Sequence, residues 1–329
     1  TSILDGLGNP QHTFSSIHIA GTNGKGSIAS ALATILRIAG YRVGLYTSPH
    51  LIRFNERICV DGTPISDDAV VASWEAVKSV HQGDREPTFF EFSTAMAFYE
   101  FARRKVDCAV IETGMGGRMD ATNVVSPTVS IITNISLEHK TYLGVTIAAI
   151  TREKAGIIKP SIPVVTGVTQ KSAKAVIEKI AAERSAPLYM KGRDFRVRRT
   201  GDDRFSYFGV DHRWAGMRTG LMGSHQLDNA SLTLAACELI MRDHDRLAKD
   251  HIQSGLAQNR WPGRLELISQ KPYVILDGAH NLMAARRLGR FLQDTLAGRR
   301  ITMVAGILDD KPYEAILKDL VAPCARLII

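Results

Sequence analysis

Residues 18–27, HIAGTNGKGS, combine three glycines with a lysine and a serine directly after an apolar stretch. Such a loop can place backbone N–H groups, a helix N-terminus and an ammonium group around phosphate oxygens. The usual phosphate-binding loop reads G-x-x-x-x-G-K-[ST], whereas here Gly26 separates Lys25 from Ser27 and Ile19 replaces the first glycine. A glycine turn without a ligand is the weaker interpretation. The predicted nucleotide-binding residues are Gly21, Thr22, Asn23, Gly24, Lys25, Gly26 and Ser27.

Other polar side chains follow other apolar stretches that read as strands. Glu112 ends VDCAVIET, and Glu138 and His139 follow TVSIITNIS. In open α/β sheets ligands bind at the carboxyl ends of the strands, and a carboxylate beside a phosphate loop is typical of a Mg²⁺ site. An ion pair or helix cap at Glu112 and a structural role for His139 are the alternatives. Ser48, in TSPH, is ambiguous by itself.

Four more residues lie near predicted element ends or on the boundary between domains. Lys154 in TREKAGIIKP is expected on a helix, where a solvated lysine is the simpler interpretation. Arg264 in WPGR, and Asp277 and His280 in LDGAHN, could equally form an ion pair and a helix N-cap. With the phosphate loop, these residues favour an enzyme that uses ATP and Mg²⁺ between two domains.

Apolar runs alternate with helical patterns over the first 184 residues, which predicts a mostly parallel α/β sheet with helices on both faces. The predicted strands are 15–20, 42–48, 106–113, 128–135 and 162–167. The predicted helices are 27–41, 66–80, 91–105, 146–158 and 172–184.

The remainder of the chain predicts an appended antiparallel hairpin, more helices and a second domain. The hairpin is expected within 187–214, with helices at 225–241 and 245–257. Trp-Pro-Gly breaks any helix, so we predict domains 1–259 and 266–329 joined by a linker at 260–265. A second βαβ series predicts a smaller Rossmann-like domain, with a strand after the linker, strands at 273–280, 301–308 and 325–329, and helices to about 295 and near 312–320. The chain stops inside an apparent strand, so we expect C-terminal residues to be missing.

The bulk composition is that of a globular chain with an anionic ligand. The 329 residues carry a net charge of +8 and are 45% hydrophobic, with no apolar run of membrane-spanning length. The residues TSILDGLGNPQH lack the pattern of a signal peptide, so we expect none. Four scattered cysteines indicate a reducing compartment, so we expect the cytoplasm. The basic stretch 191–204 is either a polyanion patch or a solvated hairpin. No aromatic interleaving or Cys/His finger supports a nucleic-acid partner, and no membrane partner is expected.

An ordered set of segments resembles the folylpolyglutamate synthase/dihydrofolate synthase family of the Mur-ligase superfamily: GTNGKGS, YTSPHLIRFNERI, TFFEF, ETGMGGRMDATNVV, NISLEHKTYLG, REKAGIIKP, WPGRLE and LDGAHN. The resemblance covers nearly the whole chain, and it implies that the shifted lysine belongs to the superfamily's own phosphate loop. It implies ATP- and Mg²⁺-dependent phosphorylation of a carboxylate, followed by attack of the L-glutamate amino group on the acyl phosphate.

The resemblance also implies roles for individual residues. Lys25 and its loop would hold the β- and γ-phosphates, and Ser48, Glu112 and His139 would ligate Mg²⁺. Lys154 matches a lysine that is carbamylated in many members and supports a second metal ion; with Lys25, Glu112 and His139 it completes the predicted catalytic set. ATP contacts would come from Asn229, Arg264, Asp277 and His280, and pterin contacts from Thr88, Phe89, Phe90, Glu91, Met119, Asp120 and Ala121.

Several functions compete. We expect a bifunctional dihydrofolate synthase/folylpolyglutamate synthase acting as a monomer, with a monofunctional folylpolyglutamate synthase or a Mur-type peptidoglycan ligase as alternatives. A P-loop switch or nucleic-acid motor and a non-catalytic folate-binding module are weaker hypotheses.

Two departures from the family are Glu138, where many members have Asp, and an upstream segment that looks absent.

Overall fold

The computed structural model describes residues 2–82, 85–201, 203–242, 245–308 and 311–329. The chain divides into two compact units. The larger unit comprises Thr1–Gly220 and Asp228–Arg260, and the smaller unit comprises Leu221–Leu227 and Trp261–Ile329. The grouping of 221–227 with the smaller unit has no counterpart in the sequence-based division, whose limits of 1–259, 260–265 and 266–329 stay a prediction.

The larger unit is built on an eight-stranded sheet in the order β4-β3-β2-β5-β1-β6-β7-β8. Strands β2, β5, β1, β6, β7 and β8 run parallel, β3 is antiparallel to β2, and β4 is antiparallel to β3. The predicted mostly parallel α/β sheet is therefore confirmed. The strands are β1 (Ser15–Ala20), β2 (Val43–Tyr46), β3 (Ile58–Val60), β4 (Thr63–Pro64), β5 (Cys108–Glu112), β6 (Val129–Ile132), β7 (Val164–Thr166) and β8 (Leu188–Met190).

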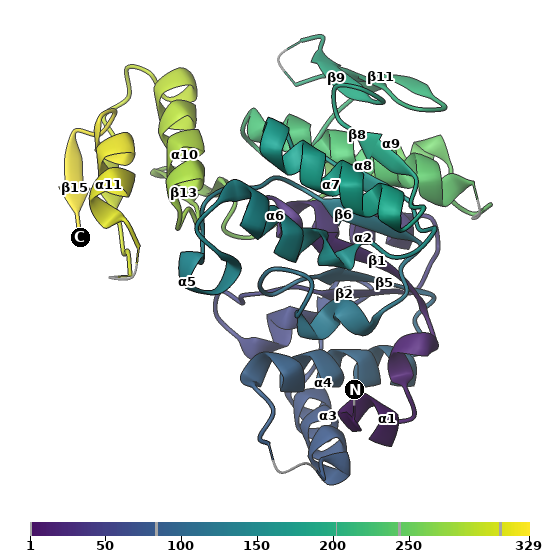
Figure 1. The fold of residues 1–329 in the computed structure, drawn as a ribbon. Helices are drawn as coiled ribbons and strands as arrows, with labels where there is room; N and C mark the ends of the chain where they lie inside the picture. The colour runs from purple at the N-terminus through teal and green to yellow at the C-terminus, as the bar shows by residue number, and fades with distance from the viewer. Residues whose placement is uncertain (1, 83–84, 202, 243–244, 309–310) are drawn as a thin grey trace. The chain divides into compact units, whose positions relative to one another are not determined.

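Helices cover both faces of this sheet (Figure 1). From the central strand β1 the chain moves through α2 to β2 on one side, whereas β6 continues through α6 to β7 on the other. Because such crossovers are right-handed, helices on the two routes lie on opposite faces. The helices are α1 (Ser2–Gly6), α2 (Lys25–Ile38), α3 (Asp67–Val80), α4 (Phe89–Arg103), α5 (Lys140–Leu143), α6 (Ile147–Lys154), α7 (Lys171–Glu183), α8 (His225–Met241) and α9 (Lys249–Gln258), with 3-10 turns η1 (Pro10–His12), η2 (Phe54–Arg57), η3 (Ala121–Val124) and η4 (Ala155–Ile157).

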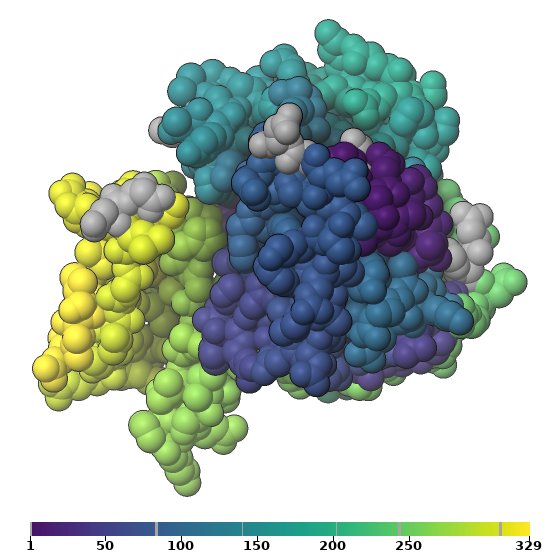
Figure 2. Space-filling view, turned by 90° about the horizontal axis from the view of Figure 1, so that it is seen from below, coloured from purple at the N-terminus to yellow at the C-terminus, as the bar shows by residue number. Residues whose placement is uncertain are grey.

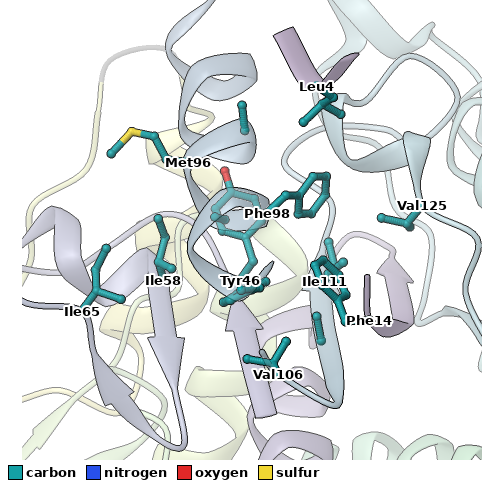
Figure 3. Close-up of a cluster of buried hydrophobic side chains, with 14 of the residues drawn as sticks. Leu4, Phe14, Tyr46, Ile58, Ile65, Met96, Phe98, Val106, Ile111 and Val125 are labelled. Atoms are coloured by element: carbon teal, nitrogen blue, oxygen red, sulfur yellow. The ribbon is translucent and has the colours of Figure 1, made fainter. Parts of the chain in front are cut away.

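A buried hydrophobic cluster packs α4 onto the sheet, while Phe89 at the start of α4 stays exposed. Phe98 on α4 packs with Tyr46 of β2 and Ile111 of β5 (Figure 3). Phe14, just before β1, meets Phe98 at 6.1 Å between ring centroids. The N-terminal helices α1 and η1 lie beside α3 and α4 (Figure 2). The start of α4 is thereby held close to the ends of β2 and β5.

Two helix starts follow directly from side-chain caps. Ser66 accepts a hydrogen bond from the Ala69 N–H and begins α3, as its position in the sequence predicts. Thr88 and Glu91 form a reciprocal capping box, so α4 begins at Phe89, two residues earlier than predicted. The capping box of Thr88 and Glu91 thus fixes the position of Phe89 at the first residue of α4.

The segment expected as a hairpin differs from the prediction. Strand β8 joins the edge of the main sheet, and β9 (Arg196–Arg199), β10 (Phe205–Phe208) and β11 (Arg213–Met217) form a separate three-stranded antiparallel sheet. Tyr207 and Trp214 pack beneath it as stacked rings, with centroids 5.3 Å apart. Buried and partly buried residues alternate along β10, as expected for a strand with one face on the core, but the polar composition of the segment concealed this third strand.

The smaller unit contains two small sheets rather than one continuous sheet among its described residues. Strands β12 (Glu266–Gln270) and β13 (Tyr273–Leu276) pair antiparallel, whereas β14 (Thr302–Val304) and β15 (Arg326–Ile328) pair parallel. The strands of the predicted βαβ series, β13 and β14, therefore lie in different sheets, and β13 pairs instead with β12 across a two-residue connection. Helices α10 (Leu282–Thr295) and α11 (Tyr313–Val321) complete the unit. Across both units, no helix of the described residues is long and apolar enough to cross a bilayer.

Candidate active site

The loop 21–24 runs from the end of β1 to the start of α2 at Lys25. Gly21 has φ 144°, and a Cβ on it would lie 1.9 Å from the Thr133 Oγ1. Gly24 has φ 90°, caps α2, and would place a Cβ 2.4 Å from the Asn229 Oδ1. Both positions therefore require glycine for conformation and for space. The loop also brings Asn229 of α8 against the phosphate-binding sequence.

Polar residues that follow β6 hold this loop. The Thr22 N–H donates to the Asn134 carbonyl at 2.8 Å, and the Asn23 N–H donates to the Asn134 side-chain oxygen at 3.1 Å. In return the Asn134 amide and the Thr133 hydroxyl donate to the Asn23 carbonyl, at 2.7 and 2.8 Å. Thr133 and Asn134 were not among the residues predicted for the site. Their polar types at the carboxyl end of an apolar strand were the available signal.

Glu112 lies at the end of β5, paired in register with Ile19 of β1. Its carboxylate is buried, and its Oε1 lies 3.6 Å from the Lys25 Nζ. The Ser48 N–H donates to its other oxygen at 3.4 Å. The structure thus brings together the phosphate-loop lysine and two of the three residues predicted to hold Mg²⁺.

Lys154 is buried at the end of α6 and reaches the phosphate loop. Its Nζ donates to the Gly21 carbonyl at 2.9 Å and lies 2.8 Å from the Glu138 Oε1. Burial lowers the pKa of Lys154 to about 8, against the opposing effect of Glu138, and the charge of Lys25 lowers it further. Burial raises the pKa of Glu138, but the charges of Lys154 and Lys25 outweigh it and hold this pKa below its usual range.

His139 follows Glu138 with φ 44° and is exposed. Within the described part of the chain, no three His, Cys, Asp or Glu side chains converge as a metal site. The predicted set contains only two such side chains, Glu112 and His139, together with the Ser48 hydroxyl. Glu112 and Ser48 fit a Mg²⁺ ion because a buried carboxylate and a hydroxyl supply the oxygen ligands that it prefers. The inclusion of His139 stays a prediction.

The start of α4 presents two neighbouring rings in different ways. Phe89 is 62% exposed, whereas Phe90 packs inward against Tyr46, with ring centroids 5.8 Å apart. Thr88 and Glu91 are engaged in the capping box, and Glu91 also lies 2.6 Å from Arg85. Of the two phenylalanines predicted to stack on a flat ring, Phe89 has the free surface.

The second predicted pterin stretch surrounds a buried acid. Met119 is 78% exposed, whereas Asp120 is buried, and Ala121 begins η3. The Asp120 carboxylate accepts hydrogen bonds from the N–H and the hydroxyl of Thr122 and from the Met115 N–H. Burial raises the pKa of Asp120, which these donors partly offset. This geometry gives Asp120 a structural role in the loop and leaves its substrate contact a prediction.

Arg264, Asp277 and His280 lie together in the smaller unit. Asp277 accepts from the N–H groups of Leu265 and Ala279 at 2.8 and 2.9 Å, and burial raises its pKa. The Arg264 guanidinium donates to the Gly263 carbonyl, and the His280 ring lies 3.0 Å from the Gly278 carbonyl. The structure brings these three residues near one another, and their contact with ATP stays a prediction.

Comparison with known proteins follows the same division of the chain. Residues 19–237 match the Mur ligase middle domain, and residues 263–329 match the Mur ligase glutamate ligase domain. A folylpolyglutamate synthase from Lacticaseibacillus casei is 41% identical over 98% of the chain and 77% of its own length. The chain belongs to the folylpolyglutamate synthase/dihydrofolate synthase family of Mur ligases.

Other members support the same family assignment. A Bacillus subtilis dihydrofolate synthase/folylpolyglutamate synthase is 42% identical over 95% of the chain and 76% of its own length. The structure of E. coli FolC in complex with DHPP and ADP superposes with a TM-score of 0.92 at 32% identity, covering 99% of this chain and 76% of that one. As a member of this family, the chain is an ATP-dependent ligase. The resemblance inferred from the ordered sequence segments is confirmed.

Proposed function

We propose that this family member joins L-glutamate to the carboxylate of dihydropteroate and of reduced folates, with ATP hydrolysed to ADP and phosphate. The observation that carries the proposal is the contact between Lys25 of the phosphate loop and the buried Glu112, with Ser48 beside them. The Bacillus subtilis relative is named for both activities, and the E. coli neighbour was solved with DHPP and ADP. These observations favour the bifunctional ligase.

The proposed chemistry has two steps. A substrate carboxylate oxygen bonds to the γ-phosphorus as the bond from that phosphorus to ADP breaks, and the glutamate nitrogen then displaces phosphate from the acyl carbon and loses a proton. Lys25 and the N–H groups of the loop would hold the transferring phosphoryl group. Ser48, Glu112 and His139 would hold Mg²⁺, which neutralises phosphate charge when bound. Phosphoryl transfer thus needs positioned charge more than an activated side-chain nucleophile.

Lys154 is proposed to act as a carbamate. A pKa of about 8 leaves part of its amine neutral near that pH, and only the neutral amine combines with CO₂. The carbamate would place a second negative charge beside Glu138, which lies 2.8 Å from the Lys154 Nζ. A cation would then be needed between them, so we propose one or two Mg²⁺ ions in all.

The remaining ligand contacts are proposed from the family resemblance. Asn229, Arg264, Asp277 and His280 would contact ATP. The stretches 88–91 and 119–121 would contact the pterin, and the exposed ring of Phe89 offers a stacking surface. We propose that domain 1–259 carries Asn229 and the pterin stretches, the linker 260–265 carries Arg264, and domain 266–329 carries Asp277 and His280. We propose the cytoplasm as the compartment, because the four cysteines are free thiols.

A monofunctional folylpolyglutamate synthase is the second candidate, because the Lacticaseibacillus casei relative is named for that activity alone. The test is phosphate release that depends on ATP, glutamate and Mg²⁺, run in parallel with 7,8-dihydropteroate and with tetrahydrofolate. Release with both acceptors supports the bifunctional enzyme. Release with tetrahydrofolate alone supports the second candidate, and release with neither contradicts both.

A further inference from the structure

Arg57 ends the 3-10 turn η2 and lies directly beside the predicted Mg²⁺ site. Its carbonyl accepts a hydrogen bond from the Thr47 N–H at 3.0 Å, which fixes it next to Ser48. Only 9% of the residue is exposed. No role was assigned to Arg57 from the sequence, although it stands within the segment SPHLIRFNERI.

Two rings orient the Arg57 guanidinium. Its Nε donates to the Nδ1 of His50 at 2.8 Å, and its central carbon lies 5.1 Å from the centre of the Phe89 ring. Phe54 meets the Phe89 ring edge-on, with centroids 6.0 Å apart. An arginine Nε always donates, so the His50 Nδ1 carries no proton in this arrangement. These contacts use the Nε and one face of the guanidinium, and no hydrogen bond to another described residue uses its two Nη groups.

Arg57 combines burial with the lack of a carboxylate partner, unlike two exposed and paired arginines of the larger unit. On the same segment, the exposed Arg53 lies 2.7 Å from Asp67, and Arg118 lies 3.1 Å from Glu153. Among the described residues, no carboxylate lies within ion-pairing distance of Arg57. Burial lowers the pKa of Arg57, while Tyr46 and the charge of Glu112 act in the opposite direction. A buried cation without a partner is costly, which points to an anion supplied by a ligand.

We propose that Arg57 binds the carboxylate of the acceptor substrate, the group that the ligase activates. This inference rests on the proposed function. The phosphates of ATP already have the loop N–H groups, the N-terminus of α2 and Lys25. Arg57 instead lies beside Ser48 and interacts electrostatically with Glu112, where phosphorylation of the carboxylate is proposed. A guanidinium matches a carboxylate through two parallel hydrogen bonds. His50 and Phe89 position the guanidinium, and Arg57 fixes the carboxylate for phosphorylation.

The test is a comparison of ligands as well as of variants. Binding of 7,8-dihydropteroate and of its carboxamide, which lacks the negative charge, is measured by calorimetry for the full chain and for Arg57→Gln. The wild-type protein should prefer the carboxylate by about tenfold to hundredfold, the range for a charge-assisted hydrogen-bond pair. Arg57→Gln should lose this preference and raise the KM for dihydropteroate, with the KM for ATP unchanged.

Two further variants separate binding from folding. Arg53→Gln removes an exposed, paired arginine four residues away and should leave the preference intact. Arg57→Lys keeps the charge without the bidentate geometry, so an intermediate preference is expected, and it replaces Arg57→Gln if that variant does not fold. Equal weakening of both ligands, or a raised KM for ATP alone, overturns the proposal. A wild-type protein that binds dihydropteroate without turnover contradicts the proposed function instead.

Discussion

The two sides of the candidate site in the larger unit are held differently. On the phosphate side, the loop 21–24 is fixed by Asn134 and by the buried amine of Lys154, which donates to the Gly21 carbonyl. On the acceptor side, Phe89 is 62% exposed, although the helix beneath it is fixed by a capping box. The first region is complete without a ligand, whereas the second presents a free ring and a guanidinium without an ion-pair partner among the described residues.

The difference corresponds to what each ligand requires. Phosphate oxygens are recognised by backbone N–H groups and by fixed charge, so the loop that holds them must be rigid before ATP arrives. A flat ring is recognised by surface area, and a side chain can supply that surface only if the free protein leaves it uncovered. Variants on the phosphate side should therefore change turnover or folding, and variants on the acceptor side should change KM.

The largest effect is expected for Lys25→Ala. Loss of the cation that holds the transferring phosphoryl group should lower kcat by about 10³-fold. The midpoint of thermal unfolding should change little, because Lys25 lies 3.6 Å from Glu112, beyond a hydrogen bond. Phosphate release and differential scanning calorimetry measure the two quantities. Full activity in the variant would contradict the assignment of the phosphate loop.

A pair of glycine variants tests how rigidly the phosphate side is built. Gly21→Ala should lower the free energy of unfolding by about 3 kcal/mol, since the new Cβ overlaps Thr133 in addition to the backbone strain. Gly40 also has a positive φ, of 85°, but open space surrounds its Cβ, so a loss of about 1 kcal/mol is expected for Gly40→Ala. Chemical denaturation measures both. Equal losses would mean that the loop adapts to a side chain.

Neighbouring phenylalanines test the acceptor side. Phe90→Ala should lower the free energy of unfolding by about 2 kcal/mol, because its ring packs against the core around Tyr46. Phe89→Ala should leave stability nearly unchanged and raise the KM for dihydropteroate about fivefold, since a lost aromatic stack is worth about 1 kcal/mol. Denaturation curves and steady-state kinetics separate the two. An unchanged KM in Phe89→Ala would remove the stacking surface from the proposed site.

The smallest effect is expected for the pH dependence of the contribution that Lys154 makes to the free energy of unfolding. In protein kept free of CO₂, so that the amine is unmodified, its pKa is about 8 in the folded chain, whereas a solvent-exposed lysine, as in the unfolded chain, has a pKa of 10.5. Between these values the unfolded chain binds more protons, so the contribution of Lys154 to stability rises as pH increases from about 8 to about 10. The difference in unfolding free energy between wild type and Lys154→Met should grow by on the order of 1 kcal/mol. A difference that falls over this range would contradict a depressed pKa.

Much of the fold could be predicted because its signals are local. Hydrophobic periodicity and helix caps such as Ser66 indicate the alternation of strands and helices. Both signals depend only on residues that are close together in the sequence. Two features depend instead on tertiary packing. One is the insertion of β5 between β2 and β1, and the other is the third strand of the β9–β11 sheet. The division of the smaller unit into two sheets was not predicted, because strand patterns do not encode which strands pair.

The site was predictable to the extent that residue types carry chemistry by themselves. Lys25 begins the helix after β1 and Glu112 ends β5, with charges that suit phosphate and metal, and the structure places them 3.6 Å apart. Asn134 and Arg57 were missed because a polar amide after a strand, or an arginine in a turn, is usually solvated. Only tertiary contacts reveal that Asn134 braces the loop and that Arg57 is buried.

Because Asn134 supports the phosphate loop, the sequence of the loop alone does not determine its conformation. Asn23 and Asn134 are 111 positions apart, so the seven residues GTNGKGS form this loop only when β1 and β6 lie side by side. Transplanting the heptapeptide onto another strand–helix junction would move the glycines and the lysine without their support. Nucleotide binding by this chain is thus expected to require an assembled sheet. A fragment ending before residue 133 would contain the loop sequence but not the residues that fix the loop conformation.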